Sequence, residues 1–207
     1  MLINNMRDRR PERGNLRGLH LLSIIALLVV LFLALGRPAY SQDTEQADNY
    51  TQGEIVTIAS RFFGMSAESV AEVMDVIFTD HGGPSGFIRG EEAGGAFFVG
   101  LRYGRGEMVM HDGETMPIFW RGPTAGWDFG GNATKTFTLI YNLNNTDDIF
   151  RRYPGVDGSA FFIAGLGVNY QRRGEVILAP IRAGVGTRLG VNIGYVKYSR
   201  EAGRNPF

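Results

Sequence analysis

The chain has 207 residues, with 21 basic and 21 acidic side chains, 44% apolar residues, 29 glycines and no cysteine. Because cysteine is absent, disulfide scaffolds, thiolate zinc sites, iron–sulfur clusters and cysteine nucleophiles are excluded. The balanced charge argues against a nucleic-acid binder, which needs a clustered basic surface. The apolar content is sufficient to build a globular core.

The first 41 residues have the three parts of a secretory signal peptide. Five arginines lie between residues 7 and 17, and they precede an apolar run, Leu21–Leu35, that only Ser23 interrupts. Ala39 and Ser41 then have the small-x-small spacing that signal peptidase recognises. The run is shorter than the roughly 20 residues of a membrane-spanning helix. We therefore expect residues 1–41 to be an export signal, with an uncleaved N-terminal anchor as the alternative.

Removing this signal changes the charge of the protein. Residues 1–41 contain six of the 21 basic and two of the 21 acidic residues, which leaves 15 basic and 19 acidic residues in the remainder. A mildly acidic, cysteine-free exported domain is common in bacterial envelopes, so we expect a periplasmic location. The polar start of this part predicts a flexible tether over residues 42–52 and a single domain over residues 53–207.

The domain begins with helical periodicity and continues with strand periodicity. Apolar residues at helical spacing predict amphipathic helices over residues 52–63 and 65–79. One or two further helical turns are expected within residues 144–153. Apolar alternation with a period of two predicts strands over residues 95–103, 107–111, 116–121, 134–143, 159–170, 175–182 and 187–198.

This order predicts an α+β, β-dominated fold, in which two amphipathic helices precede a small antiparallel β-barrel of about eight strands. A sandwich is the alternative architecture. Glycines at every second position in residues 159–168 and 187–198 favour the barrel, because glycine lets a strand bend sharply at a barrel corner.

The residues that could carry catalysis do not form a recognised motif. Ser159 lacks the second glycine of a nucleophile elbow and precedes a strand. His81 and His111 lack the helical spacing of metal ligands, and we expect an exposed turn and a surface strand at these positions. Glu91 and Glu92 are adjacent, so they point to opposite sides of an extended chain, and we interpret them as loop charges. The sequence therefore predicts no enzymatic activity, no metal and no cofactor.

The candidate binding residues lie in residues 120–130, which we interpret as a loop. This segment contains both tryptophans, Trp120 and Trp127, together with Arg121, Asp128 and a Gly-Pro pair. In the functional interpretation, the aromatic faces hold a lipid or a sugar, while Arg121 or Asp128 fixes polar groups of the ligand. In the structural alternative, the two tryptophans close one end of the barrel and Asp128 accepts hydrogen bonds across a turn.

Resemblance to a known family is carried by five segments and by a C-terminal Asn-Pro-Phe. The five segments are residues 86–96, 101–106, 120–128, 155–160 and 179–195. Together they resemble the bacterial envelope integrity protein A family of periplasmic proteins. The resemblance extends from about residue 53 to the end of the chain, and it implies a soluble periplasmic β-barrel without catalytic residues that contributes to envelope integrity. A weaker likeness to the SYLF lipid-binding domain favours a lipid-like ligand.

Together these observations predict an exported, non-enzymatic periplasmic protein that contributes to envelope integrity, binds a lipid or an envelope glycan, and can associate peripherally with the envelope. Nucleic acid is not an expected partner. Two alternatives stay open. An outer-membrane β-barrel fits the C-terminal Phe207 and the richness in glycine and aromatic residues. An envelope hydrolase would use Glu91 or Asp128.

Overall fold

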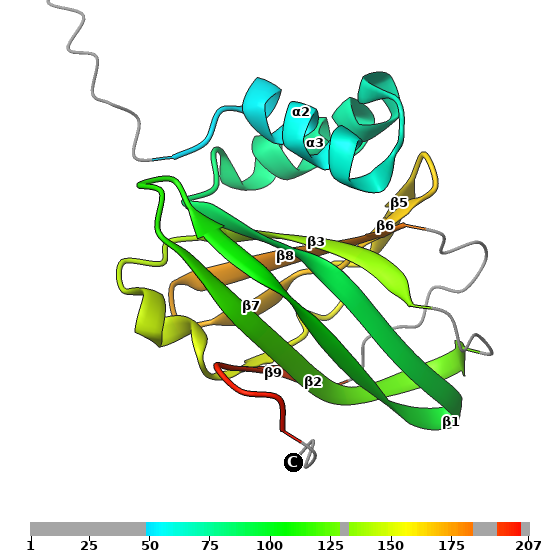
Figure 1. Cartoon of the computed structure of the whole chain (residues 1–207). Coiled ribbons are helices and arrows are strands. Elements are labelled where there is room, and N and C mark those ends of the chain that lie inside the picture. The colour runs from blue at the N-terminus through cyan, green and yellow to red at the C-terminus, as the bar shows by residue number, and fades with distance from the viewer. Residues whose placement is uncertain (1–48, 129–132, 184–193, 204–207) are drawn as a thin grey trace, which may run out of the picture. The chain divides into compact units, whose positions relative to one another are not determined.

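The computed structural model describes residues 49–128, 133–183 and 194–203, and for residues 95–100 and 124–128 it describes the backbone alone. The predicted signal peptide lies outside these residues. Within the described residues, two helices precede nine strands and one short 3-10 helix (Figure 1). The elements are α2 (Gln52–Phe63), α3 (Ala67–His81), β1 (Gly86–Met110), β2 (Thr115–Asp128), β3 (Thr134–Tyr141), η1 (Thr146–Ile149), β4 (Arg152–Pro154), β5 (Phe161–Ile163), β6 (Leu166–Val168), β7 (Gln171–Arg173), β8 (Val176–Ala183) and β9 (Tyr195–Ser199).

The folded part already includes Tyr50. Its backbone N–H donates a 2.9 Å hydrogen bond to the carbonyl oxygen of Pro84. Its hydroxyl donates to the carbonyl oxygen of Met110 at 3.2 Å, and its ring meets the imidazole of His111 edge-on. The predicted tether covered residues 42–52, and its last residues, from Tyr50 on, are therefore part of the domain.

The helices form where the sequence predicts them, and their caps explain their ends. Thr51 and Glu54 form a capping box at the start of α2, and Gly64 ends this helix in a left-handed conformation with φ of 72°. The Ser66 side chain accepts a hydrogen bond from the N–H group of Ser69 and starts α3. This helix continues to His81, two residues beyond the predicted end, so the expected turn at residues 80–81 is helical.

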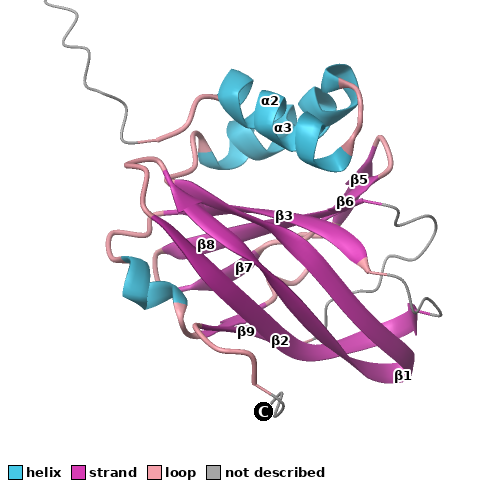
Figure 2. Ribbon diagram, in the orientation of Figure 1, coloured by secondary structure: helices cyan, strands magenta, loops and turns pink. Residues whose placement is uncertain are grey.

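All strands pair antiparallel in one curled sheet, which Figure 2 shows beneath the two helices. The strand order is β4-β9-β2-β1-β3-β8-β6-β5, and β7 pairs with the remaining part of β8. The sheet curls far enough that β7 returns beside β4, where Gly155 and Gln171 form a bridge. Next to this bridge the N–H group of Val156 donates to the carbonyl oxygen of Tyr170 at 2.9 Å. The prediction of a β-dominated antiparallel barrel after two helices is thus confirmed.

The long strand β1 folds back on itself, so that its two halves lie antiparallel like the arms of a hairpin. In Figure 1 it runs away from the helices and then returns toward them. Its two halves lie side by side, because Arg89 forms a 2.6 Å ion pair with Glu107. Gly90 and Gly106 face each other across the two halves, where a Cβ atom on Gly106 would lie 2.3 Å from the carbonyl oxygen of Arg89. Only glycine permits this approach of the two backbones.

Gly90 and Gly106, which permit this close approach, are not the glycines that the sequence indicated. The predicted strand over residues 159–170 is a hairpin of β5 and β6, whose two turn residues, Ala164 and Gly165, have φ values of 51° and 84°. Two positive φ angles are typical of a tight hairpin turn, so Gly165 serves the turn rather than a bend in a strand. In the other predicted glycine-rich strand, residues 187–193 lie outside the described residues. The expected helical turn within residues 144–153 is confirmed as η1.

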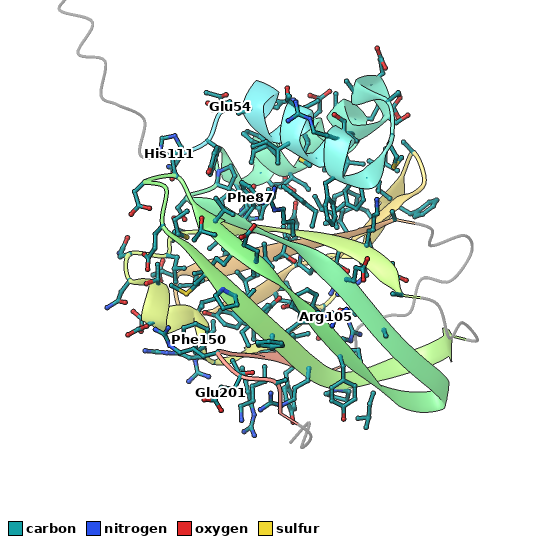
Figure 3. The ribbon with its side chains drawn as sticks, in the orientation of Figure 1. Glu54, Phe87, Arg105, His111, Phe150 and Glu201 are labelled. Carbon is teal, nitrogen blue, oxygen red and sulfur yellow. The ribbon has the colours of Figure 1, made fainter. Side chains whose placement is uncertain are left out.

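The sheet separates two apolar cores. Alternate residues of β1 belong to different cores: Phe87 packs on the helix side and Ile88 packs inside the barrel. Figure 3 shows Phe87 beneath the helices and Arg105 farther from them. The outer core includes Ile55, Ala59, Val70, Val73, Met74, Ile77, Phe137, Leu139 and Ile181. The inner core includes Met108, Ile118, Trp120, Ile140, Ile149, Tyr153, Leu178, Val196 and Tyr198.

Candidate functional site

A buried ion cluster lies inside the barrel, next to the inner apolar core. Glu92 of β1 accepts a hydrogen bond of 3.1 Å from Nε of Arg182 in β8 and lies 3.7 Å from Nη1 of Arg102. Its second oxygen, Oε2, accepts a 2.8 Å hydrogen bond from the indole N–H of Trp120. Arg182 also donates to the side-chain oxygen of Asn169 at 3.0 Å. The cluster therefore joins β1, β2 and β8 across the interior of the barrel.

The cluster keeps Glu92 charged. Burial raises the pKa of this carboxyl group, but the charges of Arg182 and Arg102 and the hydrogen bonds of Arg182 and Trp120 outweigh burial and lower the pKa to about 2. A general acid or base works best with a pKa near the working pH, so this carboxylate suits a structural role. The interpretation of Glu91 and Glu92 as loop charges is wrong, because both lie in β1, where Glu92 is buried and Glu91 is exposed.

The predicted binding loop is a strand. Residues 115–128 form β2, and their Gly-Pro pair does not make a turn. Gly122 is required because β9 passes so closely that a Cβ atom would lie 2.1 Å from the carbonyl oxygen of Tyr195. Pro123 lies beyond the β2 residues that pair with β9, so its missing N–H group is tolerated on that side.

The ring of Trp120 packs in the inner core of the barrel. Its side chain is only 4% exposed, and its ring covers Gly104, where an added Cβ atom would lie 1.9 Å from Cε2 of the indole. This packing gives Trp120 a structural role inside the barrel. Trp127 and Asp128 pair with Phe97 and Ala96 in the sheet, and their side chains lie outside the described part.

Arg121, the remaining candidate, points to the outer face of the barrel. Its Nη1 donates a 2.9 Å hydrogen bond to the hydroxyl of Ser199. Its guanidinium group lies against Gly203, where an added Cβ atom would be 2.6 Å from Cζ. These contacts from the segment around β9 hold Arg121 in place on the outer face.

Arg121 lines a groove of about 410 Å³ on this outer face, below the part that the helices cover. Tyr103 lies directly opposite Arg121 in the pairing of β1 with β2, and Arg105 lies directly opposite Phe119. Aromatic and arginine residues therefore alternate both along and across the two strands. We call these four residues the aromatic–arginine checkerboard. The remaining lining comes from Glu91, Ala93, Gly104, Trp120, Ala133, Ala202 and Gly203.

The sequence contains a signal for this groove that the interpretation missed. Residues 103–105 and residues 119–121 share one pattern, an aromatic residue followed two positions later by arginine. Two such segments place all four side chains on one face if their strands pair in antiparallel register. Of the predicted site residues whose side chains are described, Trp120 and Arg121 line this groove.

A second polar cluster lies where the end of α3 meets the sheet. The hydroxyl of Tyr170 donates to Oδ2 of Asp80 at 3.1 Å, and His81 meets the Tyr170 ring edge-on. Burial lowers the pKa of His81, and the charge of Arg172 acts in the same direction while Asp80 opposes it. His81 is half-buried rather than on an exposed turn, and His111 lies in a turn just after β1 rather than in a strand.

The described residues also show the role of Ser159 and the distribution of metal-binding side chains. Ser159 stabilises a turn, since its hydroxyl donates to the carbonyl oxygen of Val156 and accepts from the N–H group of Tyr170. Within residues 49–128, 133–183 and 194–203, His, Asp and Glu side chains do not gather into a group of three or more that could hold a metal ion.

Comparisons with known proteins identify the family. A family model described as envelope integrity protein A matches residues 48–207. Among solved structures, a crystal structure of a beta-barrel-like, uncharacterized protein from Brucella abortus is similar, with 45% identity and a TM-score of 0.71. That match covers 78% of this chain and 100% of the Brucella chain. A search of curated proteins gave no match. None of the described helices is both long enough and apolar enough to span a membrane. The chain belongs to the envelope integrity protein A family, as the resemblance of its sequence segments indicated.

Proposed function

We propose that this protein is a non-enzymatic periplasmic protein, which contributes to envelope integrity by holding a lipid or glycan ligand in the groove beside the aromatic–arginine checkerboard. Membership of the family supports the role in the envelope. The observation that carries the binding part is the groove itself, which combines exposed aromatic surface with arginines on the outer face of a rigid barrel. The periplasmic location rests on the export signal predicted from residues 1–41.

The size and lining of the groove fit a small-molecule site. Its volume of about 410 Å³ is within the usual range for ligand pockets, roughly 300–1,000 Å³. Such pockets combine apolar and aromatic surface with a few polar groups that orient the ligand. Tyr103 and Phe119 supply the aromatic surface here, and Arg105, Arg121 and Glu91 supply charged groups.

The strands beneath the groove are held from the inside of the barrel. Trp120 lies between the two β2 residues of the checkerboard, and its ring packs on Gly104, which lies between the two β1 residues. The hydrogen bond from Trp120 to Glu92 then ties β2 to the first half of β1. A site on such supported strands keeps its geometry better than a site on a loop. The predicted site residue Trp120 therefore supports the strands of the groove from the inside of the barrel.

The chemistry of the groove favours binding over catalysis. Its described lining offers one carboxylate, Glu91, beside two arginines, whereas hydrolysis of a glycosidic bond ordinarily uses a pair of carboxyl groups. The neighbouring Glu92 faces the barrel interior and bonds to Arg182 and Trp120 there, so it does not complete such a pair. These features support the non-enzymatic proposal over a hydrolase.

The arrangement of the two cores supports a periplasmic protein over an outer-membrane barrel. Transmembrane barrels have an apolar outer band and a polar interior. Here the interior is filled by apolar side chains such as Ile88 and Ile118 next to the buried ion cluster, and helices cover part of the outer face. Subcellular fractionation tests the location: osmotic shock should release the protein, whereas retention in membranes after alkaline and high-salt washing would contradict it.

Complementation of a deletion strain tests the binding role. The wild-type gene should restore growth on detergent and in low-osmolarity medium. Tyr103→Ala and Arg105→Ala, at two exposed groove positions, should fail to restore growth although the proteins accumulate to wild-type levels. Phe162→Ala is the matched control, because Phe162 is similarly exposed, at 41% against 39% for Tyr103, but does not line the groove. Full rescue by both groove variants would contradict the proposal.

A further inference from the structure

We infer that the ligand of the groove is an anionic saccharide, meaning a sugar that carries a carboxylate or phosphate group. The inference rests on the proposed function, because it assumes that the groove beside the aromatic–arginine checkerboard binds a ligand. Three features support it: the placement of the aromatic rings, the excess of positive charge, and the presence of charged side chains that need hydrogen-bond partners in the ligand.

The aromatic rings suit a ligand that has an apolar face. Tyr103 is 39% exposed on the outer face of β1, and Phe119 is half-buried on β2. The face of an aromatic ring carries partial negative charge, and the C–H groups on one face of a sugar ring carry partial positive charge, so the two stack favourably. Small lining residues, Ala93, Ala202 and Gly203, leave space for a flat ring.

The charges of the groove complement an anion. The described lining contains two basic side chains, Arg105 and Arg121, and one acidic side chain, Glu91, so its formal net charge is +1. Each arginine is the immediate cross-strand neighbour of an aromatic residue. A ligand that stacks on the aromatic ring can therefore place an acidic substituent at the adjacent guanidinium group. Arginine binds carboxylate and phosphate with paired hydrogen bonds, which adds geometric specificity.

The same charges argue against a bare acyl chain. An apolar tail in this groove would displace water from Glu91, Arg105 and Arg121 without replacing the hydrogen bonds that the water makes. Burying charged groups in this way is costly. A saccharide returns those bonds, because its hydroxyl groups donate to Glu91 and accept from the arginines. The groove thus fits a ligand that is polar at its edge and apolar on one face.

The guanidinium group of Arg121 is also held in a fixed position by its neighbours. The hydroxyl of Ser199, which accepts from Nη1 of Arg121, itself donates to the carbonyl oxygen of Glu201 at 2.8 Å. The close packing of Gly203 on the guanidinium group restricts it further. A side chain that is already fixed loses less conformational entropy on binding. Arg105, by contrast, is exposed, which makes it the better position for a substitution that leaves the fold intact.

A saccharide array tests the inference directly. The array carries bacterial saccharides in matched pairs that differ only in a uronic acid carboxylate or a phosphate group, and the protein is purified as the cell makes it. We expect binding to acidic members and not to their neutral partners, with weaker binding at higher salt. Arg105→Ala should weaken binding about tenfold or more, because it removes a charge-assisted hydrogen bond. Arg61→Ala removes the same charge from an exposed position of α2 and should bind like wild type.

Three further results would overturn the inference, and they separate its failure from that of the proposed function. Equal binding to neutral and acidic saccharides would exclude the role of charge. Binding to phosphatidylglycerol vesicles but not to saccharides, lost in Tyr103→Ala, would keep a ligand-binding groove and replace the saccharide by a lipid. Binding to neither probe, together with full rescue of the deletion strain by Tyr103→Ala, would overturn both proposals.

Discussion

The indole N–H of Trp120 lies 2.8 Å from Oε2 of Glu92, and this hydrogen bond crosses the second half of β1 to join β2 to the first half. Gly104, on the strand between them, leaves the space that the indole ring fills. The Glu92 carboxylate continues the link to Arg182 of β8. One buried carboxylate thereby connects three elements behind the groove, and the following predictions test this connection.

Replacing Glu92 should strongly destabilise the protein. Glu92→Gln keeps the size of the side chain and its acceptor for Trp120, but it removes the buried negative charge that Arg102 and Arg182 share. Loss of one partner of a buried ion pair costs about 3–5 kcal/mol. We expect the free energy of unfolding, measured by urea denaturation and circular dichroism, to fall by about 3 kcal/mol.

The adjacent residue gives a control for this substitution. Glu91 is exposed, so Glu91→Gln removes the same charge from the same strand without uncovering a buried cation. We expect its effect on the free energy of unfolding to stay within about 0.5 kcal/mol. Similar losses in the two variants would show that the ion cluster does not stabilise the barrel.

Gly104→Ala should displace Trp120. The added methyl group would lie 1.9 Å from the indole, so the ring must leave its position or the strands must separate. Overpacking of this kind costs about 1–3 kcal/mol or more. We expect a change in tryptophan fluorescence emission together with lower stability.

Gly113→Ala is the control for this substitution. Gly113 has a φ of 93°, but no atom lies within 4 Å of an added Cβ atom. Backbone strain should therefore lower the stability of this variant without changing the fluorescence emission. Unchanged emission in Gly104→Ala would contradict the packing described above.

Acid should destabilise the wild-type protein partly through Glu92. The pKa of this carboxyl group is about 2 in the folded state against an ordinary value of 4.5, so between these values the unfolded state binds more protons. The stabilisation by Glu92 is therefore complete above about pH 4.5 and is lost as the pH falls toward 2. Within this window, protonation of Glu92 should lower the free energy of unfolding, measured by urea denaturation, by at most about 1.4 kcal/mol per pH unit. Glu92→Gln should show a shallower fall over this window, and an equally steep fall would contradict the assignment.

A second pH effect should come from His81. Its pKa is lowered mainly by burial against the sheet, so the unfolded state, with a histidine pKa of about 6.5, takes up the proton first. The contribution to stability is present above about pH 6.5 and declines as the pH falls below it. His81→Phe keeps an aromatic ring beside Tyr170 and should flatten the dependence between pH 7 and pH 5. If the slope in this range is the same as in wild type, the proton taken up on unfolding belongs to another group.

The helices could be predicted from the sequence because their signals are local. Ser66 and Gly64 mark helix ends through their own backbone geometry, and the apolar stripe of each helix is complete within a few turns. The first half of β1 was missed for the opposite reason. Its inward positions are Ile88, Gly90, Glu92 and Gly94, so the buried face shows a charge and two glycines instead of apolar alternation.

The groove is harder to predict than the helices, because the pattern that indicates it becomes meaningful only once the strand register is known. Tyr103 and Phe119 are 16 positions apart in the chain, and only the antiparallel pairing of β1 with β2 places each beside an arginine. Trp120 is a predicted site residue because tryptophan is common in binding sites, but its side chain is buried on the inside of the strand pair. Alternation along a strand decides which of two neighbours, Trp120 or Arg121, meets a ligand.

Mass spectrometry of the material that copurifies with the protein tests the central claim most directly. Wild type and Arg61→Ala, purified from the periplasm under gentle conditions, should carry the same anionic saccharide. The double variant of Tyr103→Ala and Arg105→Ala should lack it while retaining the wild-type circular dichroism spectrum. The same bound species at the same occupancy in all three proteins, or no bound species in any of them, would contradict a ligand-binding role for the groove.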